Sequence, residues 1–110
     1  MSNCFIILAA GKSKRFNYKI PKAYCFYKGK TLIQHSIDKA QKSGKFKLIV
    51  LVINKNHKKY IKKLKIKNVK VTDGGKTRAE SSYKALKKIK GLKISNVLIH
   101  DAARPNFSLK

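Results

Sequence analysis

The fold class follows from the stretch C-F-I-I-L-A-A-G-K-S-K-R-F-N-Y-K-I-P-K, which occupies residues 4–22. Its first five residues form an apolar run with the length and composition of a buried parallel strand. The small residues 9–11 follow and leave room for a ligand against the backbone. Beyond them lies a basic cluster: Lys12, Lys14, Arg15 and Lys22. Because α/β folds bind phosphates with free amides and cations at such strand ends, the stretch predicts a loop that binds a nucleoside triphosphate.

Later segments predict the rest of an α/β fold. Apolar, β-branched runs predict three more strands, at residues 46–53, 69–72 and 96–100. Helical spacing predicts helices between them, over about residues 31–42, 58–64 and 79–89. Thr31 is the expected N-cap of the first helix, and Tyr83, Leu86 and Ile89 form the expected apolar stripe of the last. This alternation predicts a three-layer αβα, Rossmann-like fold with a mostly parallel sheet.

Length and charge limit the class of protein. The 110 residues suffice for one domain at most, and 43% of them are hydrophobic, as in an ordinary globular chain. Lys and Arg number 28 against four acids, but the lysines are scattered and show no nucleic-acid-binding motif, so we do not expect nucleic acid as the primary partner. The apolar runs are too short to span a bilayer, and the first strand leaves no room for a leader peptide. We therefore expect a cytoplasmic protein without a membrane partner.

The other strand ends carry residues suited to a nucleotide. Because ligands of such sheets bind beyond the carboxyl ends of the strands, these residues are expected to meet the first loop. After the third predicted strand, Gly74-Gly75 lets the backbone approach a flat ring, and Ser81 offers a hydroxyl to a base or ribose. After the fourth, Asp101 is a natural Mg²⁺ ligand beside phosphates. Alternatives stay open: a plain turn at the glycines, and a loop cap or a salt bridge with Arg104 for Asp101.

The three segments together resemble a known family. Their motifs are L-A-A-G-K-S-K-R-F…P-K, D-G-G-K-T-R-A-E-S and V-L-I-H-D-A-A-R-P, within a span from about Ile6 to Pro105. They are similar to the signatures of the 2-C-methyl-D-erythritol 4-phosphate cytidylyltransferases. The resemblance implies transfer of a cytidylyl group from CTP to methylerythritol phosphate, with release of pyrophosphate, in the non-mevalonate isoprenoid pathway. Two positions depart from the family pattern: Ser13 replaces a loop glycine, and Ala23 stands where glutamine is usual.

The resemblance also implies a role for each motif residue. Arg15 and Lys22 would be catalytic and would stabilise the transition state as the acceptor phosphate attacks the α-phosphorus of CTP. Asp101 would hold Mg²⁺, and Arg104 would lie toward the sugar phosphate. The residues that would line the CTP site and recognise the cytidine are Ala9, Ala10, Gly11, Gly75, Ser81 and Ala102.

Members of this family are about twice as long as this chain. The resemblance therefore implies that residues 1–110 are the N-terminal portion of a single nucleotidyltransferase domain, truncated at its C-terminal side. The full-length protein would be a homodimer, and full activity would need the missing half. The 110 residues alone are expected to be inactive or nearly so.

Two other functions stay open at this point. One keeps the cytidylyl transfer but uses ribitol 5-phosphate or another polyol phosphate as acceptor; only Ala103, where the ribitol enzymes tend to carry a bulkier residue, argues against it. The other is a lysine-rich module that binds nucleic acid or an anionic surface. That module would bind with a steep salt dependence that does not involve Arg15 or Lys22.

Overall fold

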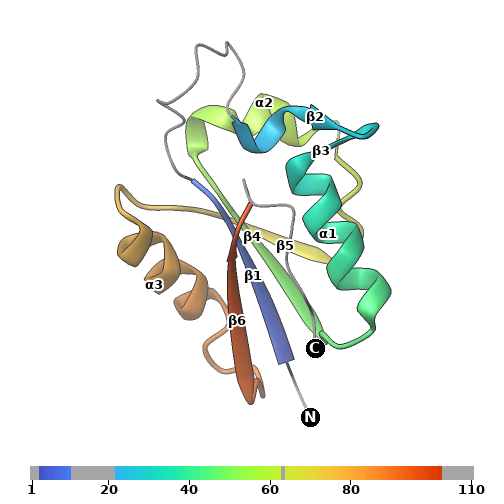
Figure 1. The fold of residues 1–110 in the computed structure, drawn as a ribbon. Helices are drawn as coiled ribbons and strands as arrows, with labels where there is room; N and C mark the ends of the chain where they lie inside the picture. Colours follow the sequence, from blue (N-terminus) through green and yellow to red (C-terminus); the bar gives the residue numbers. More distant parts are fainter. Residues whose placement is uncertain (1–2, 11–21, 63, 103–110) are drawn as a thin grey trace.

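The computed structural model describes residues 3–10, 22–62 and 64–102. Four strands form one parallel sheet in the order β5-β4-β1-β6. Their bounds are β1 Asn3–Ala9, β4 Leu48–Ile53, β5 Val69–Asp73 and β6 Asn96–Asp101. Helices α1 (Leu32–Ser43) and α2 (Lys58–Ile61) cover one face, and α3 (Arg78–Lys88) covers the other (Figure 1). The predicted three-layer αβα fold is confirmed.

Strands β1 and β4 are buried on both faces. In β1, Phe5 and Ile7 belong to the apolar cluster on the α1 side, whereas Cys4 and Ile6 belong to the cluster on the α3 side. In β4 the same alternation sends its side chains to both clusters. Because helices cover both faces of the sheet, these strands need apolar side chains at every position. The central strands are therefore the ones that their continuous apolar runs predict most clearly, although β4 begins at Leu48 rather than at residue 46.

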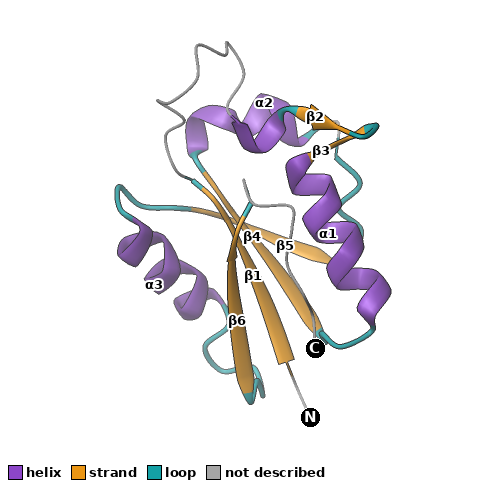
Figure 2. Ribbon diagram, in the orientation of Figure 1, coloured by secondary structure: helices purple, strands orange, loops and turns teal. Residues whose placement is uncertain are grey.

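The connection from β1 to β4 fixes α1 by its two ends. The N–H of Gln34 donates to Oγ1 of Thr31 at 3.1 Å, which confirms the predicted N-cap. Gly44 ends the helix with a left-handed φ of 66°. Before α1 lie the 3₁₀ turn η1 (Lys22–Tyr24) and an antiparallel hairpin of β2 (Phe26–Tyr27) and β3 (Lys30–Thr31) (Figure 2). These short elements bring the chain from the first loop back onto the sheet.

The connection from β4 to β5 is mostly irregular. A 3₁₀ turn, η2 (Lys55–His57), leads directly into α2, which ends at Ile61 and is therefore shorter than the predicted helix over 58–64. Partly buried side chains of this connection, Ile61 and Leu64 among them, pack against the core on the α1 side. Within the described ranges, no helix has the length and apolar character needed to cross a bilayer.

The buried face of α3 differs from the predicted one. Its buried positions are Ser81 and Ala85, with Ile89 buried just beyond the helix end, whereas Tyr83 is 64% exposed and Leu86 is 43% exposed. The prediction that Tyr83 and Leu86 face the core is therefore wrong. The physical reason is that small side chains at the i and i+4 positions allow α3 to lie close to the sheet, and this sets the rotation of the helix. Larger apolar residues are left on its outer side.

Candidate nucleotide-binding site

The carboxyl ends of the strands meet at one edge of the sheet. Ala9 lies beside Ile53, Ile53 beside Asp73, and Leu8 beside Asp101 in the strand register. Two backbone hydrogen bonds continue the pairing past the strands: Gly74 N–H donates to Ile53 O at 2.7 Å, and Ala102 N–H donates to Leu8 O at 2.9 Å. The ends of β1, β5 and β6 are thus held next to one another, as the sequence predicted.

Gly74 packs directly against the end of β1. A Cβ atom at this position would lie 2.4 Å from Cβ of Ala10 and 2.8 Å from Oγ of Ser81. It would also lie 3.0 Å from Cγ1 of Val52. Real Cβ atoms do not approach other atoms so closely, so only glycine fits between β4, the end of β1 and the start of α3. The sequence analysis assigned the close approach to Gly75 and missed Gly74, although the Gly-Gly pair after a strand carried the signal.

Ser81 holds the glycine loop onto α3. It is buried, with 3% of its surface exposed, and its Oγ accepts the N–H of Gly75 at 3.0 Å. The start of α3 is fixed as well, because Thr77 Oγ1 accepts the N–H of Glu80 at 3.1 Å. Glu80 in turn accepts the N–H of Lys76 at 3.3 Å. The loop before α3 is therefore tied to the helix by side chains at two points, which leaves it preorganised.

Replacing Ser81 with alanine tests this loop. We expect Ser81→Ala to lower the free energy of unfolding by about 1 kcal/mol, because the N–H of Gly75 loses its acceptor. Nucleotide affinity should fall as the loop loosens. Both are measured by urea denaturation and calorimetric CTP titration.

The matched control for that experiment is the neighbouring serine. Ser82 Oγ is buried and has no hydrogen-bond partner among the described residues. Ser82→Ala removes a hydroxyl of the same kind without breaking such a bond, so stability should change by less than about 0.5 kcal/mol. Equal losses in the two variants would contradict the loop-holding role of Ser81.

Asp101 ends β6 at the same edge and pairs with α3. Its Oδ1 lies 3.3 Å from Nε of Arg78, and the two side chains are 37% and 60% exposed. The alternative considered for Asp101 was a salt bridge with Arg104, which lies outside the described residues; the ion pair in the structure is with Arg78 instead. An exposed pair of this kind is weak, so it leaves the carboxylate available for exchange to another cation.

The residues present fit a divalent cation only in part. The described residues include no cluster of three or more His, Cys, Asp or Glu side chains that could hold a metal by themselves. Mg²⁺, however, is commonly held by one or two carboxylates together with substrate phosphates and water. Asp101 offers one such carboxylate at the strand end. A cation here would therefore bind with the nucleotide rather than before it.

Lys22 opens η1, and its backbone is anchored by the two residues that follow. Ala23 and Tyr24 are 8% and 3% exposed. The Tyr24 ring stacks on Tyr60 of α2 with centroids 4.8 Å apart and meets His57 edge-on at 5.7 Å. Burial, and secondarily Tyr60, raises the pKa of Tyr24 to about 12, so its phenol stays neutral at physiological pH. The turn that carries Lys22 is thus packed against the segment that follows β4.

The structure brings together five of the predicted site residues and leaves the others untested. Those at the common edge are Ala9, Ala10, Gly75, Asp101 and Ala102, with Ser81 beneath the glycine loop. Gly11, Arg15 and Arg104 lie outside the described residues, as does the side chain of Lys22. Their predicted roles stay predictions.

A parallel sheet with small-residue loops and a carboxylate at its strand ends defines a Rossmann-like α/β protein of the nucleotide-binding class. Comparison with known proteins narrows the class. The family model for 2-C-methyl-D-erythritol 4-phosphate cytidylyltransferase matches residues 3–109, and the chain belongs to this family.

Individual relatives agree with the family. The bifunctional enzyme IspD/IspF of Pelagibacter ubique is 66% identical over 110 residues, which are 100% of this chain and 30% of that protein. The crystal structure of the 2-C-methyl-D-erythritol 4-phosphate cytidylyltransferase of Francisella tularensis has a TM-score of 0.75 at 32% identity and covers 99% of this chain and 48% of its own. The fold is also shared with Rv0371c of Mycobacterium tuberculosis in its complex with manganese, at 18% identity, a TM-score of 0.79 and coverage of 98% and 54%.

The chain is much shorter than its relatives. It spans 30% of the Pelagibacter protein and between 44% and 50% of the other curated relatives compared with it. The site at the strand ends is therefore compared with a part of each relative rather than with the whole.

Proposed function

We propose that this chain forms the CTP-binding half of an enzyme that transfers a cytidylyl group from CTP to 2-C-methyl-D-erythritol 4-phosphate. The observation that carries the proposal is the meeting of three strand ends: Ala10 after β1, Gly74 packed against it after β5, and Asp101 at the end of β6. Membership of the family supplies the reaction. The loop from Gly75 to Ser81 would recognise the cytidine, and the small residues 9–11 and Ala102 would leave space for the phosphates.

The reaction needs charge neutralisation more than a protein nucleophile. An oxygen of the acceptor phosphate attacks the α-phosphorus of CTP, a new phosphorus–oxygen bond forms, and pyrophosphate leaves with the electrons of the broken bond. The attacking oxygen is already ionised, so no strong general base is required. Arg15 and Lys22 would neutralise the charge that develops on the transferred group, and Arg104 would lie toward the acceptor.

We further propose that Asp101 holds a divalent cation, with Mg²⁺ as the physiological ion. When bound, Mg²⁺ would neutralise phosphate charge and orient the triphosphate. Asp101 is suited to this because it lies at the strand end, is partly exposed and is held only by the weak contact with Arg78. The manganese bound by Rv0371c of Mycobacterium tuberculosis, which shares the fold, is consistent with a divalent cation in such a protein.

Asp101→Asn tests the cation site. We expect Mg²⁺ to strengthen CTP binding to the unmodified chain and this enhancement to fall by roughly tenfold in the variant, because an amide replaces the anionic ligand. Calorimetric CTP titrations with and without Mg²⁺ measure it. Asp73→Asn is the control, since Asp73 also ends a strand and pairs with a cation, Lys58, at 3.9 Å. A similar loss in both variants would show that net charge, not Asp101, governs the cation dependence.

The half length of the chain defines what the proposal leaves to other residues. We propose that residues 1–110 are the N-terminal portion of a single nucleotidyltransferase domain, and that the second half of the family fold supplies most of the acceptor site and the contacts of a homodimer. The 110 residues alone should bind nucleotide weakly and turn over negligibly. A cytoplasmic location suits an enzyme with these substrates.

A chimera tests the function directly. In it, this chain replaces the matching residues of the Pelagibacter ubique protein, to which it is 66% identical. We expect pyrophosphate release from CTP and methylerythritol phosphate, and much slower release with ribitol 5-phosphate in a competition assay. A folded chimera that releases no pyrophosphate with methylerythritol phosphate would refute the proposed function. Preference for ribitol 5-phosphate would keep the chemistry but change the acceptor.

A further inference from the structure

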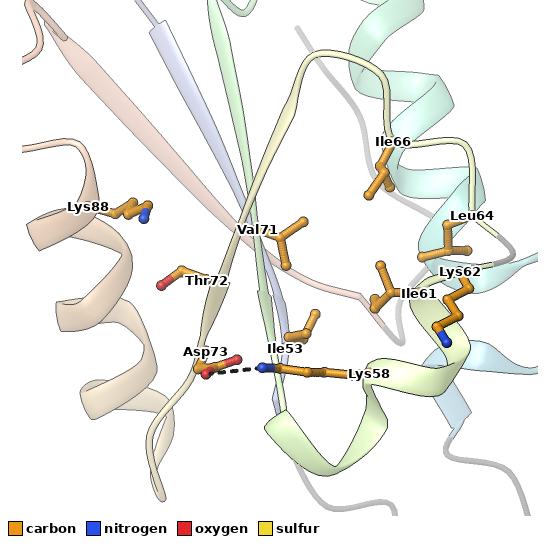
Figure 3. Close-up of a pocket in the computed structure, with 10 residues that line it drawn as sticks. All are labelled: Ile53, Lys58, Ile61, Lys62, Leu64, Ile66, Val71, Thr72, Asp73 and Lys88. Atoms are coloured by element: carbon orange, nitrogen blue, oxygen red, sulfur yellow. Dashed lines mark ion pairs between the residues drawn. The ribbon is translucent and has the colours of Figure 1, made fainter.

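A cavity of about 650 Å³ lies on the α2 side of the edge strand β5, outside the nucleotide-binding edge. It lies in the size range of small-molecule sites. Figure 3 shows Ile53 of β4 and Val71 of β5 on one side of the space, and side chains of α2 and the segment after it on the other. Its apolar lining residues are Ile53, Ile61, Leu64, Ile66 and Val71.

This apolar lining remains partly open to solvent. Ile61, Leu64, Ile66 and Val71 pack against the core cluster on the α1 side, but each is only partly buried. The cost of leaving such side chains wetted falls when an apolar group covers them. The cavity therefore favours an occupant with an apolar chain.

The polar lining of the same cavity is predominantly basic. Among its ten lining residues are three lysines, Lys58, Lys62 and Lys88, and a single acid, Asp73. The acid is already engaged, because Asp73 Oδ2 lies 3.9 Å from Nζ of Lys58 (Figure 3). Lys62 and Lys88 add positive charge from α2 and α3. A charged group of an occupant should therefore be an anion.

We propose that this cavity is a second ligand site, which binds a small amphiphilic anion with an alkyl-type apolar chain and a phosphate or phosphate-like head. The chain lies against Ile61, Leu64 and Val71, and the head pairs with Lys62 and Lys88. The site is distinct from the nucleotide edge, although Asp73 connects the two because it directly precedes Gly74. It does not depend on the proposed cytidylyl transfer.

n-Decyl phosphate is a suitable probe, with n-octyl phosphate and inorganic phosphate for comparison, all titrated below micelle-forming concentrations and followed by NMR. We expect decyl phosphate to bind roughly tenfold more tightly than octyl phosphate, because two added methylenes are buried. Inorganic phosphate should not shift the resonances of Ile61, Leu64 or Val71 in the same concentration range. Equal affinity for the two alkyl phosphates, or for inorganic phosphate, would overturn the proposal.

Charge-matched variants separate the site from the general basic field of the chain. Lys62→Glu with Lys88→Glu should weaken decyl phosphate binding at least tenfold. Lys65→Glu with Lys87→Glu lowers the net charge equally at two exposed lysines outside the cavity wall and should change affinity less than twofold. Equal weakening by the two pairs would overturn the site in favour of non-specific attraction.

Two further arms distinguish this site from the nucleotide site and from a surface that the longer protein covers. CTP should not displace decyl phosphate, and the Pelagibacter chimera should retain the binding. Displacement by CTP, or loss of decyl phosphate binding in a folded chimera, would overturn the inference. Neither result would bear on pyrophosphate release, so the proposed function is judged separately.

Discussion

Gly74→Ala is expected to abolish measurable CTP binding and to lower the free energy of unfolding by about 1–3 kcal/mol. The added Cβ would lie 2.4 Å from Cβ of Ala10, so the glycine loop must move away from the end of β1. That movement separates two of the three segments proposed to surround the nucleotide. Urea denaturation measures the stability, and calorimetric titration measures the affinity.

A second substitution tests the cause of that loss. Ala10→Gly removes the atom nearest to the new methyl group and should restore part of both stability and binding when combined with Gly74→Ala. The contacts to Ser81 Oγ at 2.8 Å and to Val52 Cγ1 at 3.0 Å remain, so recovery should be incomplete. If Gly74→Ala binds CTP normally, or if Ala10→Gly gives no recovery, the close packing of these loops does not govern the site.

Lys22→Ala is expected to lower kcat of the Pelagibacter chimera by roughly 10²–10³, with a much smaller change in KM for CTP. A preorganised cation at the transferred phosphoryl group contributes about this much, because it acts on charge that develops in the transition state. Tyr24 fixes the backbone beside Lys22 by stacking on Tyr60, so the lysine is presented from a rigid turn. Steady-state kinetics of pyrophosphate release measure the effect.

Lys28→Ala provides the matched control for Lys22. Lys28 lies in the hairpin that follows η1, and its Nζ lies 5.3 Å from the centroid of the Tyr27 ring on an exposed surface. Loss of this lysine removes the same charge from the same part of the chain, so kcat should stay within about twofold. A comparable fall in kcat for both variants would mean that the overall positive field, not Lys22, carries the effect.

The parts of the fold that the sequence predicted are those that local physics determines. The central strands β1 and β4 are apolar at every position because helices cover both faces, and this leaves an unmistakable pattern. Thr31 and Gly44 mark the ends of α1 because caps satisfy backbone groups that any isolated helix would leave open. The meeting of the strand ends follows from parallel topology alone.

The parts that were missed depend on tertiary packing. Tyr83 and Leu86 have helical spacing and apolar character, yet Ser81 and Ala85 face the sheet because close approach of α3 rewards small side chains. The partner of Asp101 is Arg78, which lies on another element and could not be chosen from Arg104 by sequence distance. Gly74 is essential only because Ala10 lies against it, and that contact joins residues far apart in the chain.

The most direct test is an NMR titration of the 110-residue chain with CTP and Mg²⁺, which maps where the nucleotide binds even when affinity is weak. The account predicts that the largest shifts of amide resonances occur at the common strand-end edge, for Ala9, Ala10, Gly75, Ser81, Asp101 and Ala102. The resonances of Ile61 and Leu64 in the cavity on the α2 side should shift little. Shifts spread over the exposed lysines, or confined to that cavity, would contradict a CTP site at the strand ends.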